Sequence, residues 1–119
     1  MLFFCCCALS SLHAQAPVND NCANAIVLDS LDGWCSMVRQ YTTVGATPTV
    51  GLATPGCMPA SNVPNDVWFA FDAIGSDVNI SISGATRLNA GGTLRSPQFA
   101  LYTGTCGNLR EANTCISDA

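Results

Sequence analysis

The sequence predicts an all-β domain with the architecture of an antiparallel β-sandwich or jelly roll. Three observations carry this prediction: short segments in which apolar and polar residues alternate, turns rich in Gly and Pro between them, and no segment with the periodicity of an amphipathic helix. The chain has 119 residues, which is enough for one domain of ordinary size and too few for two. We therefore expect one small β-domain.

The N-terminal part of this domain is expected to hold one helical turn and one imperfect strand. Residues 22–28 are the one segment compatible with the start of a helix, with Asn21 as its capping residue. Residues 35–44 contain Val, Tyr and Thr, which favour strands, although they alternate imperfectly with other residues. Residues 45–65 carry several Gly and Pro, which forbid a regular helix there.

The two clearest strands lie in the middle of the chain. Residues 67–72 combine β-branched and aromatic side chains, with apolar residues at every second position. Residues 78–83 alternate apolar and polar side chains without a fault, which is typical of a strand with one buried face. A loop is expected to follow over residues 84–97, which contain two adjacent glycines.

The C-terminal part is expected to contain two further strands. Residues 98–102 place Phe99 and Leu101 on one face of a strand. Residues 103–107 contain two glycines and are expected to form a tight turn. The turn leads to a short final strand over residues 112–117.

Residues 1–14 are expected to be a cleaved signal peptide. An apolar run over residues 1–12 is followed by small residues, with cleavage expected after Ala14. The run is too short to span a membrane, which takes about 20 apolar residues, and no basic residue precedes it. A lipoprotein signal that uses one of the cysteines at its start is the alternative. Residues 15–119 then form a single secreted domain, located outside the cell or at its surface.

The composition excludes several functions. The chain has 4 basic and 8 acidic residues, too few cations to follow a nucleic acid backbone. Its one histidine, His13, lies in the leader, and the chain contains no lysine. Because the usual bases that activate a nucleophile are missing from residues 15–119, we expect no enzyme activity.

The cysteines predict disulfide bonds. The chain has 8 Cys, and removal of the leader takes away Cys5, Cys6 and Cys7. The five that remain are Cys22, Cys35, Cys57, Cys106 and Cys115. Disulfides are typical of small exported domains, whereas the spacing contains no C-x-x-C pair of the kind that binds zinc. An odd number leaves one thiol without a partner.

Four segments in a fixed order carry a family resemblance: residues 19–26, 65–71, 101–109 and 115–118. Together they resemble a β-sandwich domain of secreted Bacteroidetes-type proteins, similar to the bacterial pre-peptidase C-terminal domains. The resemblance covers the chain from about Val18 to its end. It implies a non-catalytic domain attached to a large exported or surface protein, without a cofactor.

Members of this family usually continue past the segment that matches residues 115–118 with another hairpin and a late Cys. The resemblance therefore implies that the sandwich is incomplete at its C-terminus and lacks its last hairpin. On this basis we hypothesise that Cys106 pairs with Cys115 and Cys35 with Cys57. Cys22 is then left without its partner.

Two ligand sites are open candidates. Asp20, Asp66 and Asp118 supply hard oxygen ligands for a structural calcium ion if they converge at one end of the sandwich, although no EF-hand loop is present. The alternative is that the residues around Asp20 and Asp66 cap turns through local hydrogen bonds. Trp68 and Tyr102 are candidates for stacking on a sugar, and packing in the core is the alternative for Trp68.

The sequence thus favours a non-catalytic accessory or scaffold domain that spaces or docks neighbouring modules of an exported bacterial protein. The alternative is a carbohydrate-binding or adhesion module, with or without a structural calcium. The partners expected are the neighbouring domains, and surface glycans or proteins for the alternative. Neither nucleic acid nor a membrane span is expected.

Overall fold

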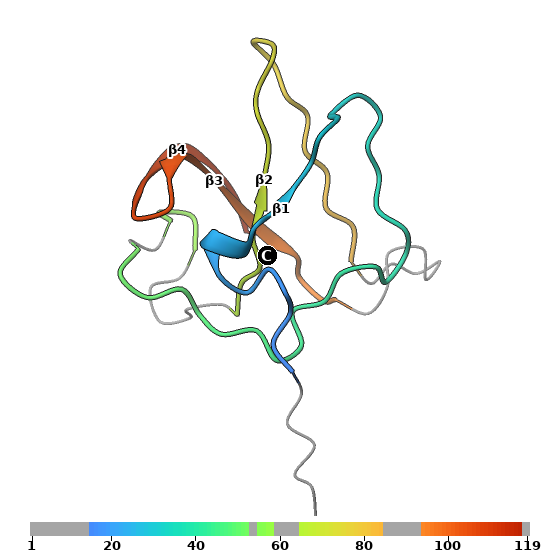
Figure 1. Cartoon of the computed structure of the whole chain (residues 1–119), viewed down its shortest axis with the longest axis vertical. Helices are drawn as coiled ribbons and strands as arrows, with labels where there is room; N and C mark the ends of the chain where they lie inside the picture. Colours follow the sequence, from blue (N-terminus) through green and yellow to red (C-terminus); the bar gives the residue numbers. More distant parts are fainter. Residues whose placement is uncertain (1–14, 53–54, 59–64, 85–93, 118–119) are drawn as a thin grey trace, which may run out of the picture.

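The computed structural model describes residues 15–52, 55–58, 65–84 and 94–117. Within these ranges the chain is all-β, with four strands, one short 3-10 turn and no α-helix (Figure 1). The elements are η1 (Cys22–Asn24), β1 (Ile26–Val27), β2 (Phe69–Ala70), β3 (Gln98–Thr105) and β4 (Asn108–Ser117). The expected all-β class is confirmed. In the part of the chain described, no helix is long and apolar enough to cross a membrane.

The helical turn expected near Cys22 is present as η1. Asn21 occupies its N-cap position, as expected, but its side chain makes no capping hydrogen bond. The turn is closed instead by backbone bonds from Asn24 N to Asn21 O and from Ala25 N to Cys22 O, at 2.9 and 3.0 Å. The chain then enters β1 directly.

Strands β1 and β2 form a parallel pair, with Ile26 opposite Phe69 and Val27 opposite Ala70. Backbone bonds at both ends extend the pair, from Ile26 N to Trp68 O (3.1 Å) and from Leu28 N to Ala70 O (2.8 Å). The expectation of a purely antiparallel arrangement is wrong for these strands. Parallel pairing requires a long crossover connection, and the chain between β1 and β2 is long enough to provide one.

Strands β3 and β4 form an antiparallel hairpin, with a register that runs from Gln98 opposite Ser117 to Thr105 opposite Asn108. Two residues, Cys106 and Gly107, remain for the turn. The expected strand is present but longer, because residues 103–105, which were expected in the turn, belong to β3. The final strand begins at Asn108 rather than at residue 112. A two-residue turn matches the natural twist of the strands that it joins, so the pairing starts at once.

Two of the expected strands are not formed in the described part of the chain. Residues 35–44 contain turns in place of a strand, including a bond from Gln40 N to Met37 O at 3.1 Å. Residues 78–83 have no strand assigned to them. They lie on the return arm of a long loop that leaves β2 and turns back at its tip (Figure 1). Alternation of side chains makes a strand only where a neighbouring strand supplies hydrogen bonds.

Among the residues whose burial is described, the interior consists of small residues and polar residues rather than large hydrophobic side chains. The buried positions are Asn19, Asp20, Ala46, Pro55 and Gly84. Two pairs of half-buried aromatic rings lie on the two faces of the segment around β2. Phe69 contacts Tyr41 with ring centroids 4.9 Å apart, whereas Trp68 contacts Tyr102 at 5.8 Å. Successive residues of an extended segment point to opposite faces, which explains the separate partners.

The disulfide pairing differs from the hypothesis. Cys22 is bonded to Cys106 and Cys57 to Cys115, while Cys35 is free and exposed. The pair expected between Cys106 and Cys115 fails because Cys115 lies opposite Ala100, six residues from Cys106 along the hairpin. Six residues of strand span roughly 20 Å, whereas a disulfide needs its Cα atoms within about 7 Å.

The pair expected between Cys35 and Cys57 fails for a second reason. Cys57 is already bonded to Cys115 on β4, and Cys35 lies in an exposed segment without strands. Cys22, for which no partner was expected in this chain, lies in η1 and reaches the turn of the β3–β4 hairpin.

Candidate functional site

Six residues from three segments form the densest group of hydrogen bonds between distant parts of the chain. We call this group the polar centre. Its members are Asn19, Asp20, Thr47, Thr49, Asp66 and Trp68. They come from the N-terminal segment, from the loop after residue 45, and from the residues just before β2.

The first contact of the polar centre joins Asp20 to Thr47. One carboxylate oxygen of Asp20 accepts the backbone N–H of Thr47 at 2.6 Å, and the other accepts its hydroxyl at 2.8 Å. Asp20 is buried. A buried carboxylate is costly unless it is hydrogen-bonded, and here both oxygens have a donor.

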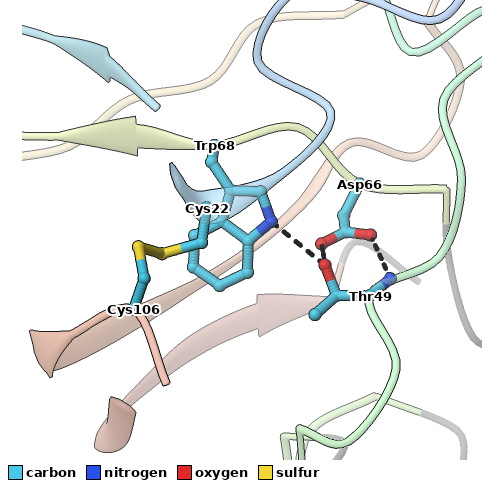
Figure 2. Close-up of a disulfide and its surroundings, with 5 residues drawn as sticks. All are labelled: Cys22, Thr49, Asp66, Trp68 and Cys106. Carbon is cyan, nitrogen blue, oxygen red and sulfur yellow. Dashed lines mark hydrogen bonds between the residues drawn. A yellow bond between two sulfur atoms is a disulfide. The ribbon is translucent and has the colours of Figure 1, made fainter. Parts of the chain in front are cut away.

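The second contact repeats this arrangement two residues later. Asp66 accepts the backbone N–H of Thr49 at 2.8 Å and its hydroxyl at 2.6 Å. The Thr49 hydroxyl oxygen also accepts the indole N–H of Trp68 at 3.1 Å (Figure 2). Thr49 thus links the carboxylate of Asp66 to the ring of Trp68.

The local sequence explains why two threonines can bind two carboxylates in the same way. Thr47 and Thr49 are separated by Pro48, which holds the backbone near an extended conformation and has no N–H of its own. In an extended segment the residues at i and i+2 face the same side. Each threonine therefore offers both an N–H and a hydroxyl to a carboxylate.

The third contact joins Asn19 to the backbone of Trp68. Trp68 N donates to Asn19 O at 2.8 Å, and the Asn19 side-chain amide donates to Trp68 O at 2.9 Å. Trp68 O also accepts the N–H of Ile26. Asn19 thus holds the segment that leads into β2 through both its backbone and its side chain, and its exposed fraction is only 3%.

Two hollows adjoin the polar centre, with volumes of about 460 and 250 Å³. Cys22, Thr49 and Val50 line both. The larger is also lined by Asp20 and Thr47, and the smaller extends to Trp68 and to the hairpin turn around Asn108. The Cys22–Cys106 disulfide lies next to the indole ring of Trp68 (Figure 2), so the disulfide and the polar centre form one region.

The hydrogen bonds decide what this region can do chemically. Among the described residues, no buried side-chain nitrogen or oxygen lacks a partner. Asp20 and Asp66 each accept two hydrogen bonds from a threonine, which fix the orientation of both carboxylates. These two are brought to the same region, as the calcium hypothesis requires, and each of their four carboxylate oxygens accepts one hydrogen bond from a threonine. Asp118 lies outside the described residues.

A metal site is not assembled elsewhere in the described ranges. In residues 15–52, 55–58, 65–84 and 94–117, no three or more His, Cys, Asp or Glu side chains are placed to hold an ion. The turn interpretation of Asp66 is close to what the structure shows, except that its partner Thr49 is 17 residues distant in the sequence. The same holds for Asp20, whose partner is Thr47.

Trp68 and Tyr102, the candidate sugar-stacking residues, contact each other. Their ring planes are tilted by 42°, and both rings are half-buried. Burial raises the pKa of the Tyr102 phenol above its usual 10.0, and the nearby carboxylates of Glu111 and Asp66 raise it further. Glu111 lies directly opposite Tyr102 in the hairpin register. The phenol is therefore held in its neutral form.

The sequence did not predict that Thr47 and Thr49 donate hydrogen bonds to Asp20 and Asp66. The two threonines flank a proline inside a stretch that reads as an irregular loop, and the carboxylates that bind them lie far away in the chain. The pattern Thr-Pro-Thr is the only local signal, and it does not identify its acceptors.

Comparisons of this chain with protein-family models, with curated proteins and with solved structures found no match.

Proposed function

We propose that this chain is a non-catalytic accessory domain of an exported bacterial protein, in which it spaces or docks neighbouring modules. The observation that carries the proposal is that the side chains of the polar centre form hydrogen bonds with one another. Its two carboxylates, two threonines and indole N–H are hydrogen-bonded to each other. These bonds connect segments that are distant in the sequence. A group of this kind serves stability rather than catalysis.

The proposal includes secretion after removal of residues 1–14. Two disulfides join parts of the chain that are 84 and 58 residues apart. Bonds of this kind are typical of proteins that fold in an oxidising compartment. The disulfides agree with one general property that the family resemblance implies, an exported domain held together by disulfides.

The finer architecture that we propose is a β-sandwich. The β3–β4 hairpin and the β1–β2 pair are the two sheets of the described residues, and two sheets that pack face to face make a sandwich. Each has only two strands, fewer than an independently stable sheet normally has.

A second candidate is a carbohydrate-binding module. The hollow of about 250 Å³ beside Trp68 favours it, because Asn108 and Thr49 line the same space and an aromatic ring with polar neighbours is suited to a sugar. Against it, the indole N–H of Trp68 is already bonded and its ring leans on Tyr102.

A glycan array probed with the oxidised chain, in calcium and in chelator, separates the two functions. The accessory domain is expected to bind no glycan selectively and to unfold at the same temperature in both buffers. Selective binding that is lost in Trp68→Ala and kept in Trp34→Ala would contradict it. Trp34 is the matched control because it is an exposed tryptophan outside the hollow.

A further inference from the structure

Residues 77–83, which we call the edge segment, have the pattern of a strand but pair with no strand of the described residues. Val78, Ile80 and Ile82 are 41%, 36% and 44% exposed, and polar residues occupy the positions between them. No hydrogen bond joins the backbone of residues 78–83 to another described residue. An extended backbone with unpaired N–H and C=O groups is a template for another strand.

We propose that the edge segment pairs with the edge segment of a second copy of this chain. The two segments would form an antiparallel ribbon around a two-fold axis that passes through Ile80. Such an interface is built from the same residues on both copies. Each residue before Ile80 therefore lies opposite a residue after Ile80 of the second copy, and the two must be compatible. The edge segment meets this requirement.

The register follows from the alternation of side chains. With Ile80 opposite Ile80 of the second copy, Val78 lies opposite Ile82, and Asn79 lies opposite Ser81. All three apolar positions then face apolar positions, and the polar positions face polar ones. A shift by two residues in either direction leaves an apolar side chain opposite a serine or a glycine, so the centred register buries the most apolar surface.

The charge pattern selects the same arrangement. Asp77 is the only charged residue between Ile74 and Gly84. In the antiparallel register it lies opposite Ser83 of the second copy, whereas an in-register parallel pair would place it beside Asp77 of the second copy. Like charges that lie directly opposite each other are destabilising. A second copy of this chain therefore fits the edge segment in the antiparallel direction.

Disulfide trapping tests the two-fold axis directly. In a Cys35→Ser background, which removes the free thiol, Ile80→Cys is expected to form a covalent dimer in air, because facing Cα atoms in an antiparallel pair lie about 4.5–5.5 Å apart. Ser81→Cys is the matched control, because Ser81 is adjacent to Ile80 and also exposed. In the proposed register Ser81 lies opposite Asn79 of the second copy, two residues from Ser81 of that copy. Equal cross-linking of the two variants would overturn the proposal.

Affinity measurements test the charge argument without relying on an apolar substitution. Ser83→Lys places a cation opposite Asp77 of the second copy twice per dimer, and Ser83→Asp places a like charge there. By sedimentation velocity at a series of concentrations, we expect the first variant to dimerise about fivefold more tightly and the second about fivefold more weakly. A chain that stays monomeric at every concentration, or two variants with the same affinity, would overturn the proposal.

Discussion

The carboxylate of Asp66 accepts two hydrogen bonds from Thr49, whose hydroxyl oxygen in turn accepts the indole N–H of Trp68. Three side chains from two segments are fixed by these contacts. The neighbouring pair of Asp20 and Thr47 has the same geometry. Hydrogen bonds between single polar residues thus hold distant segments of the described chain together, a role that a large hydrophobic core has in most domains.

Removing the Asp66 carboxylate is expected to destabilise the protein. Asp66→Ala leaves the N–H of Thr49 without its acceptor and loosens Trp68, and we expect a loss of about 2 kcal/mol in the free energy of unfolding. Urea unfolding monitored by tryptophan fluorescence measures it. Asp77→Ala is the control, because Asp77 is exposed and, among the described residues, accepts a hydrogen bond only from the hydroxyl of Ser76. Its effect should stay below about 0.5 kcal/mol. Equal effects would show that Asp66 has no special role.

The phenol of Tyr102 is expected to titrate above its usual pKa of 10.0, with burial as the main cause and Glu111 as the second. The folded state holds this proton more tightly than the unfolded state does. Its contribution to stability is therefore complete below pH 10 and is lost as the pH rises through the folded pKa.

A Tyr41→Phe variant isolates this titration, because the chain contains only 2 tyrosines. Ultraviolet absorbance of the phenolate should show a midpoint above 10.0 in the folded protein and a return to about 10 in denaturant. Adding Glu111→Gln should lower the midpoint without restoring the ordinary value. A folded midpoint at the ordinary value would contradict the burial of this ring.

Among the elements, the β3–β4 hairpin depends on two glycines at positive φ, Gly104 at 112° and Gly107 at 93°. A Cβ at Gly104 would collide with the backbone oxygen of Asn108, whereas a Cβ at Gly107 meets nothing. A side chain is therefore excluded more strongly at Gly104, where the two strands approach closely, than at Gly107.

Gly104→Ala is expected to destabilise the hairpin more than Gly107→Ala does. At Gly107 the cost is backbone strain alone, about 1–2 kcal/mol, and at Gly104 the clash adds to it. Gly56→Ala serves as the reference, since that position has neither a positive φ nor a neighbour. Urea unfolding of the three variants gives the order, and an effect at Gly104 no larger than that at Gly107 would show that the strands do not approach as described.

The elements were predictable where local chemistry decides them. Gln98 to Tyr102 form a strand as expected, and the glycines after them mark a turn. The parallel pairing of β1 with β2 was not predictable, because the residues between them carry no signal for their direction. The edge segment was predicted as a strand from its own alternation, but strand formation depends on a partner that the alternation does not supply.

At the scale of the whole molecule, disulfides and hydrogen bonds join the described segments, and no large hydrophobic side chain is buried in this part of the chain. Ala46 is the one hydrophobic residue that stands out as buried in the described part of the chain. The Cys22–Cys106 bond closes a loop of 84 residues, for which the chain-entropy treatment gives a stabilisation of about 4–5 kcal/mol. The cysteine content predicted disulfides correctly, but their pairing depended on a hairpin register that the spacing of cysteines does not reveal.

Loss of either disulfide is therefore expected to unfold the chain, whereas loss of the free thiol is not. The double variant Cys22→Ser with Cys106→Ser should lose its cooperative thermal transition, because about 4 kcal/mol is a large share of the stability of a small domain. Cys35→Ser is the control, since Cys35 is exposed and, within the described ranges, donates a hydrogen bond only to the adjacent carbonyl of Ser36. A stable double variant would show that the polar centre suffices without the bond.

Peptide mapping of the oxidised chain without reduction tests the central claim most directly, namely that the N-terminal segment is tied to the hairpin turn beside Trp68. Mass spectrometry should find Cys22 linked to Cys106 and Cys57 linked to Cys115, with Cys35 alkylated as a free thiol. Links of Cys106 to Cys115 and of Cys35 to Cys57 would contradict the account, because they require a different hairpin register and leave the N-terminal segment untethered.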